Sequence, residues 1–445
     1  MSTFIKYLRL YLHTSAAAGP LRRPIGYLSQ YGDILRVSFD EDYIADAQRP
    51  VLSQVYRGET EAQTRAILRA QRDLRVVRTD GHWPAYFMNL LPESHNRRRL
   101  ARERGCSEED EFELLAAAGH DLMGALEVEP LAPQAELPRE VRNWHTALGL
   151  DVLEPGFVET PVEDGAALPG VVDKFSAIKD GRRYVVKRHG QAGEYILKLP
   201  STDHPDLAEN EFTGYRLCQA LGLDCAQAEL IPRAEAELPE ATPFEHVLAV
   251  RRFDRELLPS GAVRRVHFEE FCQVFGLEPR QKYGTDLLRD YGQIALVLEH
   301  LSGEPARDGA EFVRRFVAFI LMGNCDAHLK NWGLLYPDGR QPRLAPVYDP
   351  VCVAAHFDDA DPRRYGYNRA IDARLRAFSM ADLEALLRSA RLPQRRLTQL
   401  LRAAREAVAQ ARAEWPALLQ DAPEAVRRTV SARLAGGVAL SVASA

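Results

Sequence analysis

The stretch "FILMGNCDAHLKNWGLLYPDG", residues 319 to 339, determines how the rest of the chain is interpreted. An apolar run ends here abruptly, and the chain soon becomes apolar again. The polar residues in between are Asp326, His328, Lys330 and Asn331. The preceding "EFVRRFVAFILM" is apolar on most faces and predicts a buried helix that ends at Gly323 and Asn324. We therefore expect the polar residues on a loop anchored by a rigid element, where functional side chains are commonly placed.

The spacing within this loop is typical of phosphoryl transfer. Asp326 and Asn331 are separated by four residues, the D-x-x-x-x-N pattern of protein kinases. There the Asp accepts the proton of an attacking hydroxyl, and the Asn holds a magnesium ion beside it. Downstream, "RLAPVYDP" predicts a short strand that ends in Asp349, where a second magnesium-binding carboxylate is required. Taken alone, Asp and Asn in a loop are more often turn formers or helix caps.

The upstream motifs supply the remaining parts in the right order. "YILKLP" places Lys198 in a strand, where it would meet phosphates, and "AENEFTGYRL" places Glu211 at the start of a helix, with Glu209 as a competitor for the pairing with Lys198. "LPGVVDKFSA" offers Gly170 and Lys174, which could cover phosphates with backbone N–H groups and one charge. Each motif also has an ordinary structural interpretation. Their combination in this order predicts kinase chemistry.

Composition sets wider limits. With 445 residues, 46% of them hydrophobic, the chain is long enough for two or three domains. A net charge of -6 gives no electrostatic reason to expect direct nucleic-acid or membrane binding. The arginine-rich stretch at residues 97–104 is interpreted as a solvated helix face in preference to a nucleic-acid contact. The longest apolar run, residues 316–322, is too short to span a bilayer, and six scattered cysteines indicate reduced thiols in the cytoplasm.

These motifs resemble the HipA family of bacterial serine/threonine kinases, the toxins of toxin–antitoxin pairs. "PAYFMNLLPES" and "GHDLMGALEVEP" are similar to the family's N-terminal subdomain, and "EEFCQVFGLEPRQKY" to its nucleotide-binding half. The resemblance implies an α+β, two-lobed, protein-kinase-like fold with a mixed β/α N-lobe, an all-helical C-lobe and an extra N-terminal α/β subdomain. The expected divisions are the subdomain 1–130, a connector 131–168 with at most one short helix, the N-lobe 169–260, the C-lobe 261–435 and a tail 436–445.

The resemblance also assigns roles to residues. Asp326 would be the catalytic base, Asn331 and Asp349 would bind Mg²⁺, and "RRF" (251–253) would be the hinge that touches adenine. The residues expected around ATP are Pro169, Gly170, Val171, Val172, Asp173, Lys174, Lys198, Glu211, Arg251, Arg252, Phe253, His328, Lys330, Asn331, Tyr348 and Asp349. The chain departs from the family at Ala167, where an autophosphorylated serine is common, at Val172, where glutamine is common, and at Arg251, where an acidic residue is common.

The implied function is Mg-ATP-dependent phosphorylation of a protein hydroxyl, on an aminoacyl-tRNA synthetase, which arrests growth. The implied partner is a small helix-turn-helix antitoxin that would also mediate contact with DNA. Two alternatives remain open. A small-molecule kinase of the aminoglycoside or choline type shares the Asp/Asn/Asp set but lacks the N-terminal subdomain. A non-catalytic module that only binds an antitoxin or acts as a corepressor is favoured slightly by Val172, Arg251 and the missing serine, and opposed by the intact catalytic set.

Overall fold

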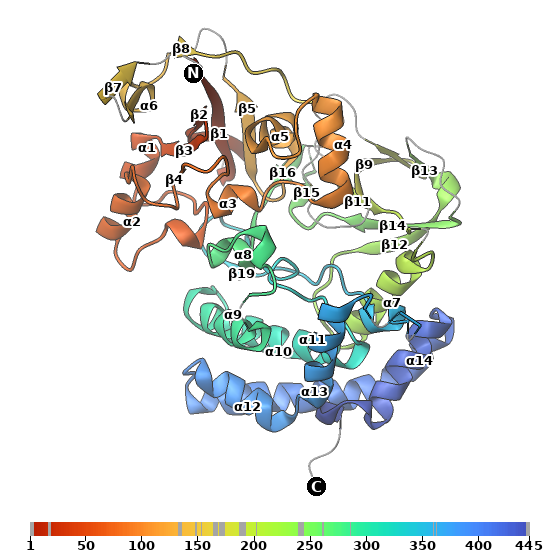
Figure 1. Ribbon diagram of the computed structural model, residues 1–445. Coiled ribbons are helices and arrows are strands. Elements are labelled where there is room, and N and C mark those ends of the chain that lie inside the picture. The colour runs from red at the N-terminus through yellow and green to blue at the C-terminus, as the bar shows by residue number, and fades with distance from the viewer. Residues whose placement is uncertain are drawn as a thin grey trace.

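Two β-sheets lie above a layer of helices in this computed structural model, with the N-terminal residues in the first sheet and the C-terminal residues in the helices (Figure 1). The structure describes residues 4–16, 19–131, 136–146, 149–152, 154–162, 168, 174–186, 193–201, 203–238, 244–259, 262–284, 286–358, 360–361 and 363–441. The expected phosphate-covering residues Pro169, Gly170, Val171, Val172 and Asp173, and also Ala167, lie outside this described part.

The first sheet has the strand order β4-β3-β2-β1-β5, with β8 paired to β1. Its strands are β1 (Phe4–Ala16), β2 (Gly19–Tyr31), β3 (Ile34–Phe39), β4 (Val77–Arg78), β5 (Leu126–Pro130) and β8 (Glu154–Pro155). Alternation in β1 buries Leu8, Leu10 and Leu12 in one core. Helices cover this sheet, namely α1 (Glu41–Ala45), η1 (Gln54–Tyr56), α2 (Glu61–Leu68), α3 (Ala85–Met88), α4 (Ser94–Arg104), α5 (Glu111–Ala118) and η2 (Gly119–Asp121).

The second sheet, with the order β12-β14-β11-β9-β10-β13, forms the expected nucleotide-binding region. Its strands are β9 (Lys174–Asp180), β10 (Arg183–Val186), β11 (Tyr195–Lys198), β12 (Ala228–Pro232), β13 (Ala236–Glu237) and β14 (His246–Arg251). Register places Lys198 between Lys174 on β9 and Leu248 on β14. Helix α7 (Leu207–Ala220) packs against β14 and β12. The strands and the helix expected here from composition are confirmed.

Helices dominate the C-terminal part. They are α8 (Phe271–Val274), η4 (Pro279–Gln281), α9 (Leu287–Leu301), α10 (Pro305–Met322), η5 (Val353–His356), α11 (Gly366–Ala377), α12 (Met380–Ser389), α13 (Gln394–Leu418), η6 (Leu419–Asp421), α14 (Glu424–Ala432), η7 (Arg433–Gly437) and η8 (Ala439–Ser441). Helix α10 packs against α9 and α13 and ends at Gly323, whose φ of 81° is left-handed, as expected from the sequence. None of the helices in the described residues is long and apolar enough for a membrane span.

The expectation of an all-helical segment from residue 261 to residue 435 is wrong in one respect. A three-stranded sheet of β17 (His267–Glu270), β18 (Gly333–Tyr336) and β19 (Arg343–Leu344) lies within it, and β16 (Val263–Arg265) pairs with β15 (Arg255–Leu257). Gly333 allows this pairing, because a Cβ there would lie 2.7 Å from the Glu269 carbonyl oxygen. In the described residues of the connector, one short helix, α6 (Arg139–Arg142), is followed by a hairpin, β6 (Asn143–Thr146) with β7 (Gly149–Val152). The division into domains stays a prediction.

A buried charge network joins the first sheet region to the second sheet. Asp121, at the end of η2, accepts hydrogen bonds from Arg252 (2.8 Å), Arg255 (3.2 Å) and Ser176 (2.8 Å). Arg252 also pairs with Asp254 at 2.9 Å, and all four charged side chains are nearly inaccessible to solvent. Buried charges of this kind are tolerated only when every partner is present. The network therefore holds the two parts of the chain in one arrangement.

We expect Asp121→Ala to lower the free energy of unfolding by about 3–5 kcal/mol, because it leaves two buried guanidinium groups short of a counter-charge. Chemical denaturation measures this difference. The matched control is Asp180→Ala at the exposed end of β9, where we expect a change within about 0.5 kcal/mol. Equal effects of the two substitutions would contradict the structural role assigned to the buried charge network.

Candidate active site

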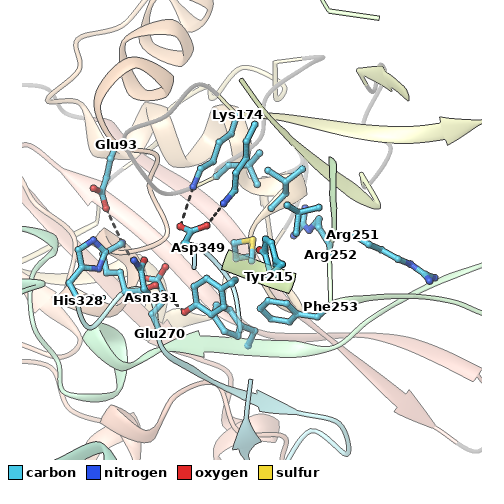
Figure 2. Close-up of a pocket in the computed structure, with 18 of the residues that line it drawn as sticks. Glu93, Lys174, Tyr215, Arg251, Arg252, Phe253, Glu270, His328, Asn331 and Asp349 are labelled. Atoms are coloured by element: carbon cyan, nitrogen blue, oxygen red, sulfur yellow. Dashed lines mark hydrogen bonds and ion pairs between the residues drawn. The ribbon is translucent and has the colours of Figure 1, made fainter. Parts of the chain in front are cut away.

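A cavity that opens to solvent lies between the second sheet and the loops that follow α10 (Figure 2). Most of the described residues expected around ATP line it. They are Lys174, Lys198, Arg251, Arg252, Phe253, His328, Lys330, Asn331, Tyr348 and Asp349. Glu211 contacts Lys198 from α7 without lining the cavity, and Asp326 lies in the same loop as Asn331. The chain thus brings segments more than 150 residues apart to one place.

Lys198 forms ion pairs with two carboxylates at this cavity. Its Nζ lies 2.5 Å from Glu211 Oε1 and also contacts Asp349 Oδ1, while Lys174 Nζ lies 3.7 Å from Asp349 Oδ2. Figure 2 shows Lys174 and Asp349 directed toward each other. Burial alone would raise the pKa of Asp349, but the charges of Lys174 and Lys198 hold it well below its ordinary value. The carboxylate is therefore ionised at neutral pH.

The structure decides between the two candidate partners of Lys198, and it shows an unusual backbone conformation at Asp349. Glu209, the competitor for Lys198, pairs instead with His246 Nδ1 at 2.9 Å, so Glu211 is confirmed as the carboxylate that contacts the lysine. Asp349 has a left-handed backbone, with a φ of 53°. A non-glycine residue in that region costs about 1–3 kcal/mol and persists mostly at functional sites, where the surroundings impose it.

The loop after α10 folds tightly around Asp326. Asn331 Nδ2 donates to the Asp326 carbonyl oxygen at 3.0 Å, and the His328 N–H donates to the same oxygen at 2.7 Å. Every residue from 315 to 334 is buried except Asp326, which is partly exposed. The D-x-x-x-x-N spacing therefore places an accessible carboxylate next to an amide that lines the cavity.

Lys330 is held by protein groups on the cavity wall. Its Nζ lies 3.0 Å from Glu270 Oε2 and 3.2 Å from Glu93 Oε1, and it donates to the Asn89 carbonyl oxygen at 3.2 Å. The expectation that Lys330 contacts ATP stays a prediction, because these acceptors already surround its charge. Burial raises the pKa of Glu270 to about 7, against the lowering effect of Lys330. Lys330 therefore connects the residues before α4 to the loop that carries Asn331.

The residues expected near adenine divide into two groups. Phe253 packs against Phe268 and Tyr348, with ring centroids 5.2 Å and 5.7 Å apart, which gives an aromatic wall suited to a planar ring. The guanidinium of Arg252 instead enters the network with Asp121 and Asp254, so only the rest of this residue faces the cavity. The partly exposed Arg251 donates to Gln227 Oε1 at 3.2 Å.

His328 has a buried ring nitrogen to which no described residue forms a hydrogen bond. Burial lowers its pKa to about 4, so the ring is neutral at physiological pH. Its Nδ1 is buried and has no hydrogen-bond partner among the described residues. A buried polar atom without a partner is costly, and a ligand that offers one would remove that cost.

Several residues of the site had no role in the sequence analysis. Glu93, Glu270 and Lys282 line the cavity, and Tyr283 and Asn368 contact Asp326. The first four fall within "PAYFMNLLPES" and "EEFCQVFGLEPRQKY", which were quoted for resemblance alone. No spacing rule indicates which distant charge each of them would meet. For Asn368 no sequence signal was present.

The donors suit magnesium better than a metal that needs a protein cage. No group of three or more His, Cys, Asp or Glu side chains that could hold a metal ion occurs within the described residues. Magnesium commonly takes one or two protein oxygen ligands and completes its shell with phosphate and water oxygens. The Asp349 carboxylate and the Asn331 amide, which line one cavity, fit that requirement.

A lysine–glutamate pair beside an Asp/Asn/Asp set is an arrangement of the type that kinases use. The HipA-like C-terminal domain matches residues 166–415, and the HipA N-terminal domain matches residues 21–129. The chain therefore belongs to the HipA family, and the resemblance seen in the motifs is confirmed. Its fold is mixed α/β, and relatives of the chain are named as kinases.

Two relatives and one solved structure illustrate the likeness. The chain is 34% identical over 397 residues to "Putative kinase Y4dM" of Sinorhizobium fredii, covering 88% of each chain. It is 27% identical over 293 residues to the serine/threonine-protein kinase toxin HipA of Shewanella oneidensis, covering 61% of this chain and 64% of the toxin. A structure of the Shewanella oneidensis HipA, HipB and operator DNA complex matches with a TM-score of 0.62 and 20% identity over 96% of both chains, which shows a shared fold.

We expect Glu211→Gln to weaken the binding of Mg-ATP about tenfold or more, because Lys198 then keeps only Asp349 as a counter-charge and is drawn away from the phosphates. Titration calorimetry measures the dissociation constant. Glu209→Gln, two residues away on the same helix, is the control and should bind as the wild type does. If both variants bound equally well, Lys198 would not depend on Glu211.

Proposed function

We propose that this chain is a serine/threonine protein kinase that transfers the γ-phosphoryl group of ATP, with magnesium, to a protein hydroxyl. One observation carries the proposal. Lys198 on β11, Asn331 in the loop after α10 and Asp349 after β19 line a single cavity, with Glu211 on α7 in contact with Lys198 and Asp326 in the same loop as Asn331. This is the set of groups that phosphoryl transfer requires for positioning and charge stabilisation.

Each residue has a separate task in this proposal. Lys198, oriented by Glu211, binds the phosphates, and His328 offers to the nucleotide its Nδ1, which has no hydrogen-bond partner in the part of the chain that the structure describes. Asp349 and Asn331 would hold magnesium, which neutralises charge on the phosphate oxygens. Asp326 takes the proton of the acceptor hydroxyl as its oxygen bonds to the γ-phosphorus and ADP leaves. The ionised state of Asp349 and the partial exposure of Asp326 suit these tasks.

The biological setting is proposed from the family. The Shewanella oneidensis relative is named a kinase toxin, and its solved complex contains HipB and operator DNA. By this likeness we propose that the chain acts in the cytoplasm, binds a small helix-turn-helix antitoxin and meets DNA through that partner. We further propose an aminoacyl-tRNA synthetase as the acceptor, with growth arrest as the result.

Asp326→Asn and Asp349→Asn should each reduce phosphoryl transfer by at least about a hundredfold, because one removes the proton acceptor and the other a magnesium ligand. Transfer of labelled phosphate from ATP to protein measures the loss. Asp421→Asn, a well-exposed carboxylate after α13, should transfer at the wild-type rate. Undiminished labelling by Asp326→Asn would contradict the proposal.

Phosphoproteomics should identify the acceptor. Cells that express the wild type are compared with cells that express Asp326→Asn, and we expect a serine of an aminoacyl-tRNA synthetase to be phosphorylated only with the wild type. A small-molecule kinase would instead label small alcohols and leave the proteome unchanged. That result would replace the protein acceptor by a small one while leaving the site intact.

A further inference from the structure

Two side chains from outside the loop hold one oxygen of the Asp326 carboxylate. The Tyr283 hydroxyl and the Asn368 Nδ2 both donate to Oδ1, the latter at 2.9 Å. Among the described residues, nothing donates to Oδ2. We propose that Tyr283 and Asn368 are positioning residues that select Oδ2 as the oxygen that accepts the proton of the protein acceptor. This inference rests on the proposed kinase function.

The segment that carries Tyr283 is fixed to the loop. The Leu329 N–H donates to the Lys282 carbonyl oxygen at 2.9 Å, and the Tyr283 ring meets His328 edge-on with centroids 5.2 Å apart. The following Gly284 has a left-handed φ of 63°, and a Cβ there would lie 1.6 Å from Asp290 Oδ2. The left-handed backbone at Gly284 favours glycine at the turn after Tyr283, while the hydrogen bond of Lys282 and the ring contact with His328 hold the tyrosine beside the loop.

Asn368 is fixed from the other side. It lies in the first turn of α11, and its Nδ2 also donates to the Cys325 carbonyl oxygen at 3.4 Å. Further along α11, the buried Asp372 contacts Arg433, which donates to the Ile320 carbonyl oxygen at 3.1 Å. Ile320 belongs to α10, the helix that precedes the loop. Helix α11 is thus attached to the element that positions Asp326.

The protonation states fit this arrangement. Burial raises the pKa of Tyr283 above its ordinary value, and the negative charge of Asp326 raises it further, so the phenol stays protonated and acts as a donor. Since both donors occupy Oδ1, the acceptor O–H transfers its proton to Oδ2. The acceptor oxygen uses a lone pair to form the bond to the γ-phosphorus, and the bond from that phosphorus to the bridging oxygen of ADP breaks.

The surroundings indicate where the acceptor approaches. Asp326 is the one partly exposed residue between positions 315 and 334. Beside it, the Tyr367 side chain is 54% exposed and packs against Tyr283 with ring centroids 4.6 Å apart. A protein segment that brings its hydroxyl to Oδ2 would therefore arrive on the side where α11 begins.

The test uses Tyr283→Phe and Asn368→Ala in the full chain, with myelin basic protein as the acceptor. We expect kcat to fall about tenfold to a hundredfold in each variant, because a misoriented carboxylate meets the hydroxyl less often in a reactive geometry. The KM for ATP and the ATP dissociation constant should stay within about twofold of the wild type. A loss confined to kcat separates positioning from general damage to the fold.

Tyr291→Phe is the matched control. Its hydroxyl donates to the Ala327 carbonyl oxygen at 2.6 Å, in the same loop, but does not touch the Asp326 carboxylate. This variant should lose thermal stability while keeping a kcat within about threefold of the wild type. A wild-type kcat in Tyr283→Phe and Asn368→Ala, or a parallel loss of ATP binding, would overturn this inference and leave the proposed function intact. A wild type that transfers phosphate neither to myelin basic protein nor to any protein of a cell lysate would overturn the proposed function and this inference with it.

Discussion

The contact of one buried lysine with two carboxylates is the interaction on which the rest of the site depends. Lys198 comes from a strand, Glu211 from a helix and Asp349 from a segment 151 residues farther along the chain. Each of the three charges is stabilised here by an opposite charge, since isolated ionised groups are expensive to remove from water. The pairing therefore requires the second sheet, α7 and the segment after β19 to come together in one geometry.

The N-terminal part of the chain is built into this geometry. Asp121 binds the two arginines that follow β14, and Glu93 reaches the ammonium of Lys330, next to Asn331. Both contacts are ion pairs, and each includes a residue that lines the cavity, Arg252 in the first and Lys330 in the second. A displacement of the first sheet would thus act on the site through these contacts, which physically connect the N-terminal part of the chain to the cavity.

The residues around Asp326 extend this account to the acceptor side. In the proposed kinase the cavity would hold the nucleotide, but the cavity does not by itself orient the carboxylate that would meet the acceptor. By our proposal, Tyr283 in the turn after η4 and Asn368 in α11 supply that orientation, each held near the loop by further hydrogen bonds. Preorganised groups of this kind lower a barrier because they need no rearrangement during the reaction.

The sequence by itself determined the order of the chemical groups and most elements that carry them. The buried helix before Gly323, the strand of Lys198, the helix of Glu211 and the Asp326–Asn331 loop follow from local patterns, because periodicity and short spacing report on neighbours along the chain. The strand expected to end in Asp349 is shorter than predicted, since β19 covers only Arg343–Leu344. Its pairing with β18, and the pairing of β18 with β17, were missed, since these strands are short and β17 lies far from the other two in the sequence.

Tertiary structure alone decided which charges meet. Only the fold shows that Lys330 is surrounded by Glu93 and Glu270, and that the guanidinium of Arg252 turns away from the cavity toward Asp121. The two donors on Asp326 lie 43 and 42 residues away from it, beyond the reach of any spacing rule. The physical reason is that ion pairs and hydrogen bonds depend on distances in space, which the chain sets only once its separate elements have packed together.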